Sequence, residues 1–487
     1  MATLTPSHTK VQTVRRLKLT QVSWPSIWPQ IVSSGPVEPS RAHFLIANLM
    51  AFLTHLGVPT VKTAMTFGVS RDHGTFEWAG TSLSSIFAQK RNLFNLQMWK
   101  LIFDIIRFNE FALDLLRADG DRNPIARASH PEPRIRVEES IGDYLDREGY
   151  SQMFRDDYLI PVTASVWGVT PGKYSPQCPA ITFVRLMWNH HLLGIMAKGP
   201  DWRIINGGLK QYIDAVMKDI PLDRVHVKTK ITAVVPTQRG TVVVTANGRD
   251  QEYDHVILAT HGDQAFEILQ PVATKEEIDI LGSFQTRRNI AVLHSDVSLM
   301  PKRRIAWSAR NYLTESPFPP TGSANVSKVC LTYWMNLLQH IPEHEFGPVL
   351  VTLNPLNVPD PRLAQGIWEY SHSLYNNAVI KSQQLLPKIQ NTRNISYCGA
   401  WTKYGSHEDG FRSGLAVAVH HLGAHLPFEL VDSALWTRRK PVLSWGNYML
   451  RIVILAIQIT ALTISLTSHL VLKAAARGSH KTRKGRP

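Results

Sequence analysis

The sequence predicts a mixed α/β fold and a single helix at the C-terminal end. Three observations support this prediction. Residues 221–270 contain short β-branched runs separated by the hairpin signal Asn247-Gly248. Residues 395–418 read as a short apolar strand, a small-residue turn and an Ala/Val-rich helix that begins near Gly410. Residues 452–472 form a run of 21 residues without a charge, which is long enough to span a bilayer.

Composition narrows the possible functions. With 487 residues, 44% of them hydrophobic, the chain can bury a large core, and its length predicts two or three domains. The cysteines Cys178, Cys330 and Cys398 are scattered and describe neither a disulfide framework nor a zinc site. The net charge of +15 gathers at both ends of the chain and forms no internal basic stripe interleaved with aromatic residues. This distribution disfavours nucleic-acid binding and favours a membrane or an organelle signal.

The N-terminal half alternates short strands with helices. Residues 44–56 predict an amphipathic helix, residues 65–78 a hairpin, and residues 96–117 a helix of about six turns with an apolar stripe. Residues 118–137 are rich in charge and proline and predict a loop. His190 and His191 are adjacent, so on a helix they point about 100° apart, and no metal site is predicted there.

The middle of the chain is rich in strands. A strand through Val225, Val227 and Ile231, a second at 241–245 and a third at 253–260 predict a three-stranded meander. In residues 290–313 and 329–341, apolar and polar side chains alternate at Ala291 and Leu293 and, more loosely, at Thr332-Tyr333-Trp334-Met335, as they do in strands. His294, Ser295 and Asp296 are sequence neighbours that cannot converge on one point of an extended strand, so a hydrolase triad is disfavoured.

The wording of four stretches identifies a family resemblance. Residues 397–418, YCGAWTKYGSHEDGFRSGLAVA, resemble the C-terminal flavin-binding segment of the flavin amine oxidase superfamily, in its bacterial and fungal branch of predicted NAD/FAD-binding proteins. The W-x-x-x-x-G-G segment at 202–208, D-x-V-I-L-A-T at 254–260 and residues 290–313 resemble the same branch. The resemblance covers roughly residues 42–430.

This resemblance implies a fold, a cofactor and a set of site residues. It implies an FAD/NAD(P)-binding Rossmann-like domain interrupted by a substrate domain of mixed sheet and helices, with FAD as cofactor. It places Ile231 at the adenine and Ala259 and Thr260 beneath the pyrophosphate. The remaining implied flavin contacts are Gly399, Ala400, Gly410, Phe411, Ser413 and Gly414.

The resemblance leaves the catalytic residues unidentified. His407, Tyr333 and Trp334 are candidates, although core packing explains the two aromatic residues equally well. His407-Glu408-Asp409 could supply an acid or base beside the flavin ring, or could cap a turn. The lysine that many amine oxidases place near the flavin has no recognisable counterpart, which argues against amine oxidation.

One family feature is missing. Relatives begin with a strand–G-x-G-x-x-G–helix unit that admits the FAD pyrophosphate, and no G-x-G-x-x-G occurs in this sequence. Three functions therefore stay open, the last of them an amine oxidase that acts on polar substrates. The first is an FAD-dependent oxidoreductase that abstracts hydride from a hydrophobic small molecule or lipid. The second is a membrane-anchored scaffold that kept the fold without FAD.

The expected organisation follows the chain in order. The boundaries are a divergent or unstructured N-terminus at 1–41, a largely helical mixed region at 42–220, an FAD-domain meander at 221–270, a β-rich substrate domain at 271–390, the C-terminal FAD-binding segment at 391–430, a linker at 431–451, a transmembrane or interfacial helix at 452–472 and a basic tail at 473–487. The expected partners are a hydrophobic small-molecule substrate and a membrane, not a nucleic acid. The sequence leaves compartment and oligomeric state open.

Overall fold

The computed structural model describes residues 32–34, 47–120, 139–162, 178–189, 192–193, 201–316, 328–431 and 441–483. These residues form several sheets packed with helices, so the predicted mixed α/β fold is confirmed. His190, His191 and most of the predicted loop at 118–137 lie outside the described residues.

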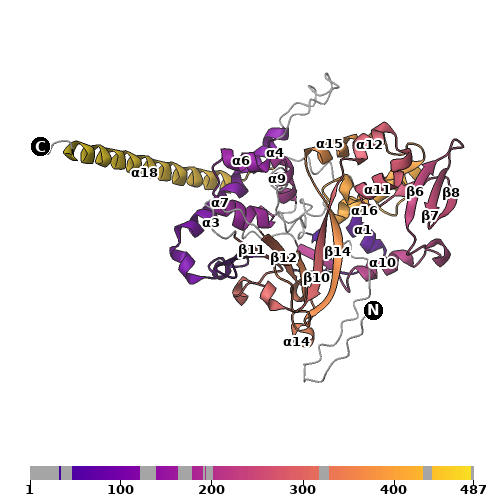
Figure 1. Ribbon diagram of the computed structural model, residues 1–487, viewed down its shortest axis with the longest axis horizontal. Helices are drawn as coiled ribbons and strands as arrows, with labels where there is room; N and C mark the ends of the chain where they lie inside the picture. The colour runs from indigo at the N-terminus through magenta and orange to yellow at the C-terminus, as the bar shows by residue number, and fades with distance from the viewer. Residues whose placement is uncertain are drawn as a thin grey trace, which may run out of the picture.

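The largest sheet has seven strands and joins two distant parts of the chain (Figure 1). Its strands, in spatial order, are β14 (Ala364–Ser373), β10 (Thr286–His294), β13 (Leu350–Leu353), β12 (Lys328–Trp334), β11 (Arg310–Glu315), β3 (Phe67–Arg71) and β4 (Phe76–Ala79). All neighbours pair antiparallel except β3 and β11, which pair in parallel. The hairpin predicted at 65–78 is therefore confirmed as β3–β4, and it extends the sheet of the predicted substrate domain.

A helical layer packs on the β3–β4–β11 end of this sheet. Its members are α2 (Leu83–Ile86), η1 (Lys90–Phe94), α3 (Leu96–Phe111), α4 (Leu113–Gly120), α6 (Ile141–Arg147), α7 (Gln152–Phe154), the π-helical turn η2 (Arg155–Leu159) and α9 (Ala180–Asn189). Apolar residues of these helices share one core with Val69, Trp78 and Tyr312 of the sheet. The single helix predicted at 96–117 is interrupted at Ala112, where Leu115 N donates to Ala112 O at 3.1 Å and the turn tightens.

The other side of the body holds two small sheets. The antiparallel meander consists of β6 (Ile231–Pro236), β7 (Val242–Ala246) and β8 (Arg249–Tyr253), with Asn247-Gly248 at the predicted turn. The predicted third strand, 253–260, is wrong in its pairing. Its centre forms β9 (Val256–Leu258), which leaves the meander and pairs in parallel with β15 (Ile395–Tyr397). The first strand begins at Ile231 and not at Val225, because Lys228 adopts a positive φ of 57° that breaks an extended run.

Helices complete this part of the molecule. Between β9 and β15 the chain forms α11 (Gly262–Leu269), η4 (Gln270–Val272), α12 (Lys275–Leu281), α15 (Asn377–Leu385) and η7 (Leu386–Lys388), which bury one face against the two strands. Shorter turns flank the large sheet: η5 (Val297–Leu299), η6 (Arg304–Ala306), α13 (Met335–Leu338) and α14 (Glu343–Phe346). A further sheet has the order β1 (Val32–Ser34), β5 (Asp201–Ile205) and β2 (Thr60–Lys62), beside α1 (Ala47–His55), α10 (Leu209–Met217) and η3 (Leu222–Arg224). Strand β1 lies in the segment predicted to lack regular structure.

The C-terminal helix α18 (Trp445–Arg483) projects from the body (Figure 1). It is longer than the predicted 452–472. Its segment Trp445–Ser468, 24 residues, is long and apolar enough to cross a membrane. The base of α18 is held at the α3–α4 junction, where Arg451 Nη1 lies 2.9 Å from Asp114 Oδ1 and Asn447 Nδ2 donates to Glu110 at 3.0 Å.

Candidate functional site

The predicted flavin segment folds as a strand, a tight turn and a helix. Strand β15 is buried and ends at Tyr397, after which Gly399 adopts a φ of 144° that favours glycine. The short turn η8 (Ala400–Thr402) follows, and helix α16 (His407–Leu422) begins earlier than the predicted Gly410. The reason is a capping box: Ser406 Oγ accepts from Asp409 N at 3.1 Å and the Asp409 carboxylate accepts from Ser406 N at 2.9 Å.

The turn is held against both α16 and the end of β9. Gly399 N donates to Ser413 Oγ at 2.8 Å. A Cβ on Gly410 would lie 3.3 Å from Ala400 N, so the helix approaches the turn closely at that position. Trp401 Nε1 donates to Thr260 O at 2.9 Å. The structure thus brings the ends of β9 and β15 and the first turns of α16 to one place.

The remaining predicted cofactor residues are distributed around this place. Ala259 directly precedes Thr260 and is exposed, and Ile231 packs on the apolar cluster that contains Leu258 and Tyr397. A Cβ on Gly414 would meet nothing within 4 Å, so space is open beside the second turn of α16. Phe411 instead faces α1, where its ring lies 4.9 Å from that of Phe52.

Glu408 ties α16 to α1. It is 2% exposed, and its carboxylate accepts from Asn48 Nδ2 at 2.6 Å and from Leu49 N at 2.9 Å. Burial raises the pKa of Glu408 to about 7, although these donors favour the ionised form. Glu408 and Asp409 therefore act as helix-capping groups, the second of the two roles considered for this stretch.

The three catalytic candidates do not meet. His407 is exposed on the first turn of α16, with its ring 6.1 Å from that of Tyr212. Tyr333 is 1% exposed in β12 and belongs to a separate core. Trp334 stacks edge-on against Trp307 at 5.4 Å. In the described part of the chain, no hydrogen bond, ion pair or ring contact joins Tyr333 or Trp334 to α16.

A buried carboxylate pair escaped the sequence analysis. Asp156 and Asp157 lie on the π-helical turn η2, and Asp157 Oδ2 is 2.6 Å from Arg71 Nη1 of β3. Burial raises the pKa of Asp156 to about 6 and that of Asp157 to about 7. Tyr312 in β11 is fully buried, and burial raises its pKa as well. The sequence signal that could have identified this pair is the presence of two adjacent Asp residues within an apolar helical stretch. Asp157 joins the helical layer to the sheet, whereas Asp156 accepts from Gln152 Nε2 within the layer at 3.0 Å.

The family model "flavin containing amine oxidoreductase" matches residues 79–286. No curated protein sequence matches the chain.

Solved structures of putrescine oxidase share the fold. Putrescine oxidase bound to putrescine has 14% identity and a TM-score of 0.51, covering 78% of this chain and 86% of that one. A putrescine oxidase triple mutant with redesigned cofactor binding has the same identity and TM-score, covering 77% and 85%. The fatty acid isomerase of P. acnes that produces CLA has 12% identity and a TM-score of 0.49, covering 79% and 85%. The resemblance to the flavin-containing amine oxidoreductases is thus confirmed over residues 79–286, and the chain has the fold of this family.

Proposed function

We propose that the chain is a membrane-anchored FAD-dependent oxidoreductase that takes hydride from a hydrophobic small molecule or lipid. The observation that carries the proposal is the junction of three elements: Thr260 after β9, the Gly399-Ala400 turn after β15, and Gly410 and Ser413 on α16. The family match over residues 79–286 supports the same chemistry.

The residues at this junction fit a flat, uncharged ring system. The turn and helix present glycine, alanine and serine, and the space beside Gly414 is open. All of the predicted cofactor residues keep some exposed surface, so a ligand can reach them. Gly399, Ala400, Ser413 and Gly414 would hold the flavin. When bound, a flavin supplies the hydride acceptor, and the protein supplies binding, orientation and a dry environment.

The adenosine half of FAD has less support on this chain. The sequence has no G-x-G-x-x-G, and in the described residues no strand pairs with the second edge of β9. Ala259 and Thr260 remain exposed or half-exposed at the end of that strand. Binding of the pyrophosphate would therefore depend on groups other than the usual glycine-rich loop.

Two features support the membrane anchor and the hydrophobic substrate. The segment Trp445–Ser468 of α18 has the length and composition of a bilayer span, and most of its apolar side chains are exposed. Asn447 and Arg451, in the first turns of this segment, bind α3 and α4. The part of α18 that would lie in the bilayer therefore begins after Arg451, and the body would be held close to it. A substrate dissolved in lipid would then be locally concentrated.

An absorbance spectrum of the full-length chain in detergent tests the cofactor. We expect the visible bands of an oxidised flavin, and we expect Gly414→Leu to lose them while the protein stays folded, because the leucine fills the open space beside α16. The matched control is Gly57→Leu, at another glycine whose Cβ direction is open but which lies in the turn after α1. Since Gly57 has a φ of 66°, its variant also bears the larger backbone strain. Loss of flavin from the control alone would contradict the assignment.

The second candidate function is a scaffold without FAD. The missing glycine-rich loop and the two-stranded β9–β15 sheet favour it. A colourless, folded protein that does not take up added FAD would establish the scaffold. Peroxide release with amines would instead establish an amine oxidase.

A further inference from the structure

A corner of the helical layer exposes large apolar side chains. At η1 and the first turn of α3, Phe94 is 90% exposed and Leu96 is 83% exposed. Leu83, Leu93 and Trp99 beside them are 64%, 43% and 48% exposed. Single exposed apolar residues are ordinary, but a group of them on one corner marks a contact surface.

This corner is held rigidly. Trp99 Nε1 donates to Leu93 O at 2.8 Å, and the rings of Phe87 and Trp99 lie 5.3 Å apart. Gln89 is buried and its Nε2 donates to Thr75 O at 2.9 Å, which fixes η1 to the β3–β4 turn. Asn95 caps α3 by accepting from Gln97 N at 2.9 Å. Phe94 and Leu96 therefore project from an ordered support.

The surroundings of the corner are positively charged. Residues 78–103 contain no Asp or Glu, whereas they contain Lys90, Arg91 and Lys100. None of these three cations has a carboxylate partner among the described residues. Apolar and aromatic side chains flanked by Lys and Arg are typical of surfaces that lie on anionic bilayers.

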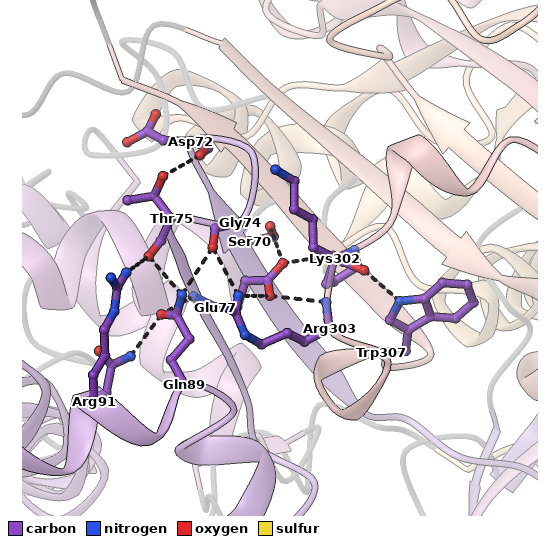
Figure 2. Close-up of polar contacts among 12 residues, drawn as sticks. Ser70, Asp72, Gly74, Thr75, Glu77, Gln89, Arg91, Lys302, Arg303 and Trp307 are labelled. Atoms are coloured by element: carbon purple, nitrogen blue, oxygen red, sulfur yellow. Dashed lines mark hydrogen bonds and ion pairs between the residues drawn. The ribbon is translucent and has the colours of Figure 1, made fainter.

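A cavity next to η1 adds further positive charge (Figure 2). It has a volume of about 510 Å³, and Arg91 lines it together with His73, Lys302 and Arg303. Buried Glu77 lies behind it and is paired with Arg303 Nη1 at 2.8 Å and with Lys302 N at 2.6 Å.

This pairing leaves the cavity cationic. Figure 2 shows the amino end of Lys302 turned away from Glu77, and no ion pair to Lys302 Nζ occurs in the described part of the chain. Gly74 makes room for the Lys302 stem, since a Cβ there would lie 2.8 Å from Lys302 Cδ. Arg91 Nη2 donates to Thr75 O at 2.6 Å, which holds the guanidinium at the rim of the cavity. The remaining N–H groups of Arg91 and the amino group of Lys302 can thus bind phosphate oxygens.

The same helix that carries the exposed corner also holds the anchor. Leu96 and Trp99 begin α3, and Glu110 near its end binds Asn447 of α18. In Figure 1, α3 lies on the side of the body from which α18 projects. A bilayer entered by α18 would therefore lie on the side of the molecule that carries α3.

We propose that η1 and the first turn of α3 form a second membrane contact, specific for anionic phospholipid surfaces. Phe94, Leu96 and Leu93 enter the interfacial region of the bilayer that α18 crosses. Arg91 and Lys302 bind the phosphates of headgroups at the adjoining cavity. The proposal rests on the membrane anchor of the proposed function, but it does not depend on FAD.

Probe fluorescence on the full-length chain tests the contact. The native cysteines Cys178, Cys330 and Cys398 are buried, so a Cys introduced by Phe94→Cys can be labelled with an environment-sensitive dye. Leu222→Cys is the matched control, because Leu222 is 86% exposed in η3. In the chain η3 lies between α10 and β6, and Figure 1 shows these two elements on the opposite side of the body from α3. The labelled proteins are reconstituted in vesicles of phosphatidylcholine and phosphatidylserine at about four to one.

We expect the dye at position 94 to shift to the blue and to be quenched by spin-labelled lipids, while the dye at position 222 stays in water. In the Phe94→Cys background, Arg91→Gln with Lys302→Gln should reduce the quenching in phosphatidylserine vesicles and leave it unchanged in phosphatidylcholine alone.

Two results would overturn the inference and leave the anchor intact. In the first, the protein stays in the vesicles during alkaline extraction, which shows that the anchor holds, while the dye at position 94 still emits as in water. In the second, the dye at 94 is already shielded in detergent, and the unlabelled Phe94→Cys protein is oxidised to an intermolecular disulfide by an added two-electron oxidant, which makes the corner a dimer interface. Alkaline extraction of the protein from the vesicles would overturn the anchor, and with it this inference.

Discussion

Gly399 and Gly414 both lie in the predicted flavin segment, but only Gly399 occupies a position that a larger residue would strain. Gly399 combines a φ of 144° with a neighbouring indole, since a Cβ there would lie 2.6 Å from Trp401 Nε1. That indole is the group that binds Thr260 O. Gly414 lies inside α16, where a Cβ meets nothing within 4 Å. The first glycine shapes the turn, whereas the second leaves room beside the helix.

Gly399→Ala should therefore destabilise the protein by roughly 1–3 kcal/mol, through backbone strain and displacement of Trp401. Gly414→Ala is the control and should stabilise it by about 1 kcal/mol, because alanine favours a helix. Thermal unfolding in detergent, followed by circular dichroism, measures both. Equal effects of the two substitutions would contradict the role of Gly399.

From the environment of His294 we expect the free energy of unfolding to depend on pH. It is fully buried, its Nδ1 accepts from Asp296 N at 3.1 Å, and its Nε2 lies 2.7 Å from Thr352 Oγ1. This geometry holds the neutral ring with the proton on Nε2, and burial lowers the pKa of His294 to about 4 from the usual 6.5.

Because the folded-state pKa is lowered, the unfolded chain binds a proton first as the pH falls below about 6.5, and stability is lost between pH 6.5 and about 4. The raised pKa values of Asp156, Asp157 and Glu408 act in the opposite direction, so the wild-type curve alone is ambiguous. The melting temperature of His294→Gln should fall less between pH 7 and 5 than that of the wild type. His344→Gln, at an exposed histidine, should follow the wild type.

For helices and strands, the sequence predicts where several elements lie but not which strands pair with one another. The hairpin at 65–78, the Asn247-Gly248 turn and strand β15 follow from residue types alone. The strand that pairs with 256–258 cannot be predicted from residue types, because Val-Ile-Leu fits the edge of an antiparallel meander as well as it fits a parallel strand. The start of α16 was missed because Ser406 and Asp409 form a capping box upstream of the glycines.

In the candidate site, too, the sequence indicates which residues take part but not their contacts with distant segments. The resemblance named Thr260, Gly399, Ala400, Gly410 and Ser413, and the structure brings them together. It could not show that Phe411 packs against Phe52, because that contact depends on how α1 sits against α16. The contact of Arg71 with Asp157 joins residues 86 apart and has no local signal.

For the whole molecule, stability should be unevenly distributed. The seven-stranded sheet gives β10 a partner on each side, whereas β9 pairs only with β15 in the described residues and leaves Ile257 40% exposed. A two-stranded sheet is marginal alone, and parallel strands are usually buried on both faces. The site proposed for the flavin therefore lies on the less stable part of the body, where a bound ligand has the largest effect on local opening.

Hydrogen exchange of the full-length chain in detergent tests this distribution. Amides of 256–258 should exchange faster than those of 291–293 in β10, because only one edge of β9 is paired. Added FAD should slow exchange at 256–260 and 397–414 and leave 291–293 unchanged, since the ligand stabilises only the elements it joins. Gly414→Leu should abolish that protection without changing exchange in β10. Exchange that FAD leaves unaltered at 256–260 and 397–414, in a protein whose β10 is protected, would favour the scaffold over the oxidoreductase, because the fold would then persist without any contribution from the cofactor.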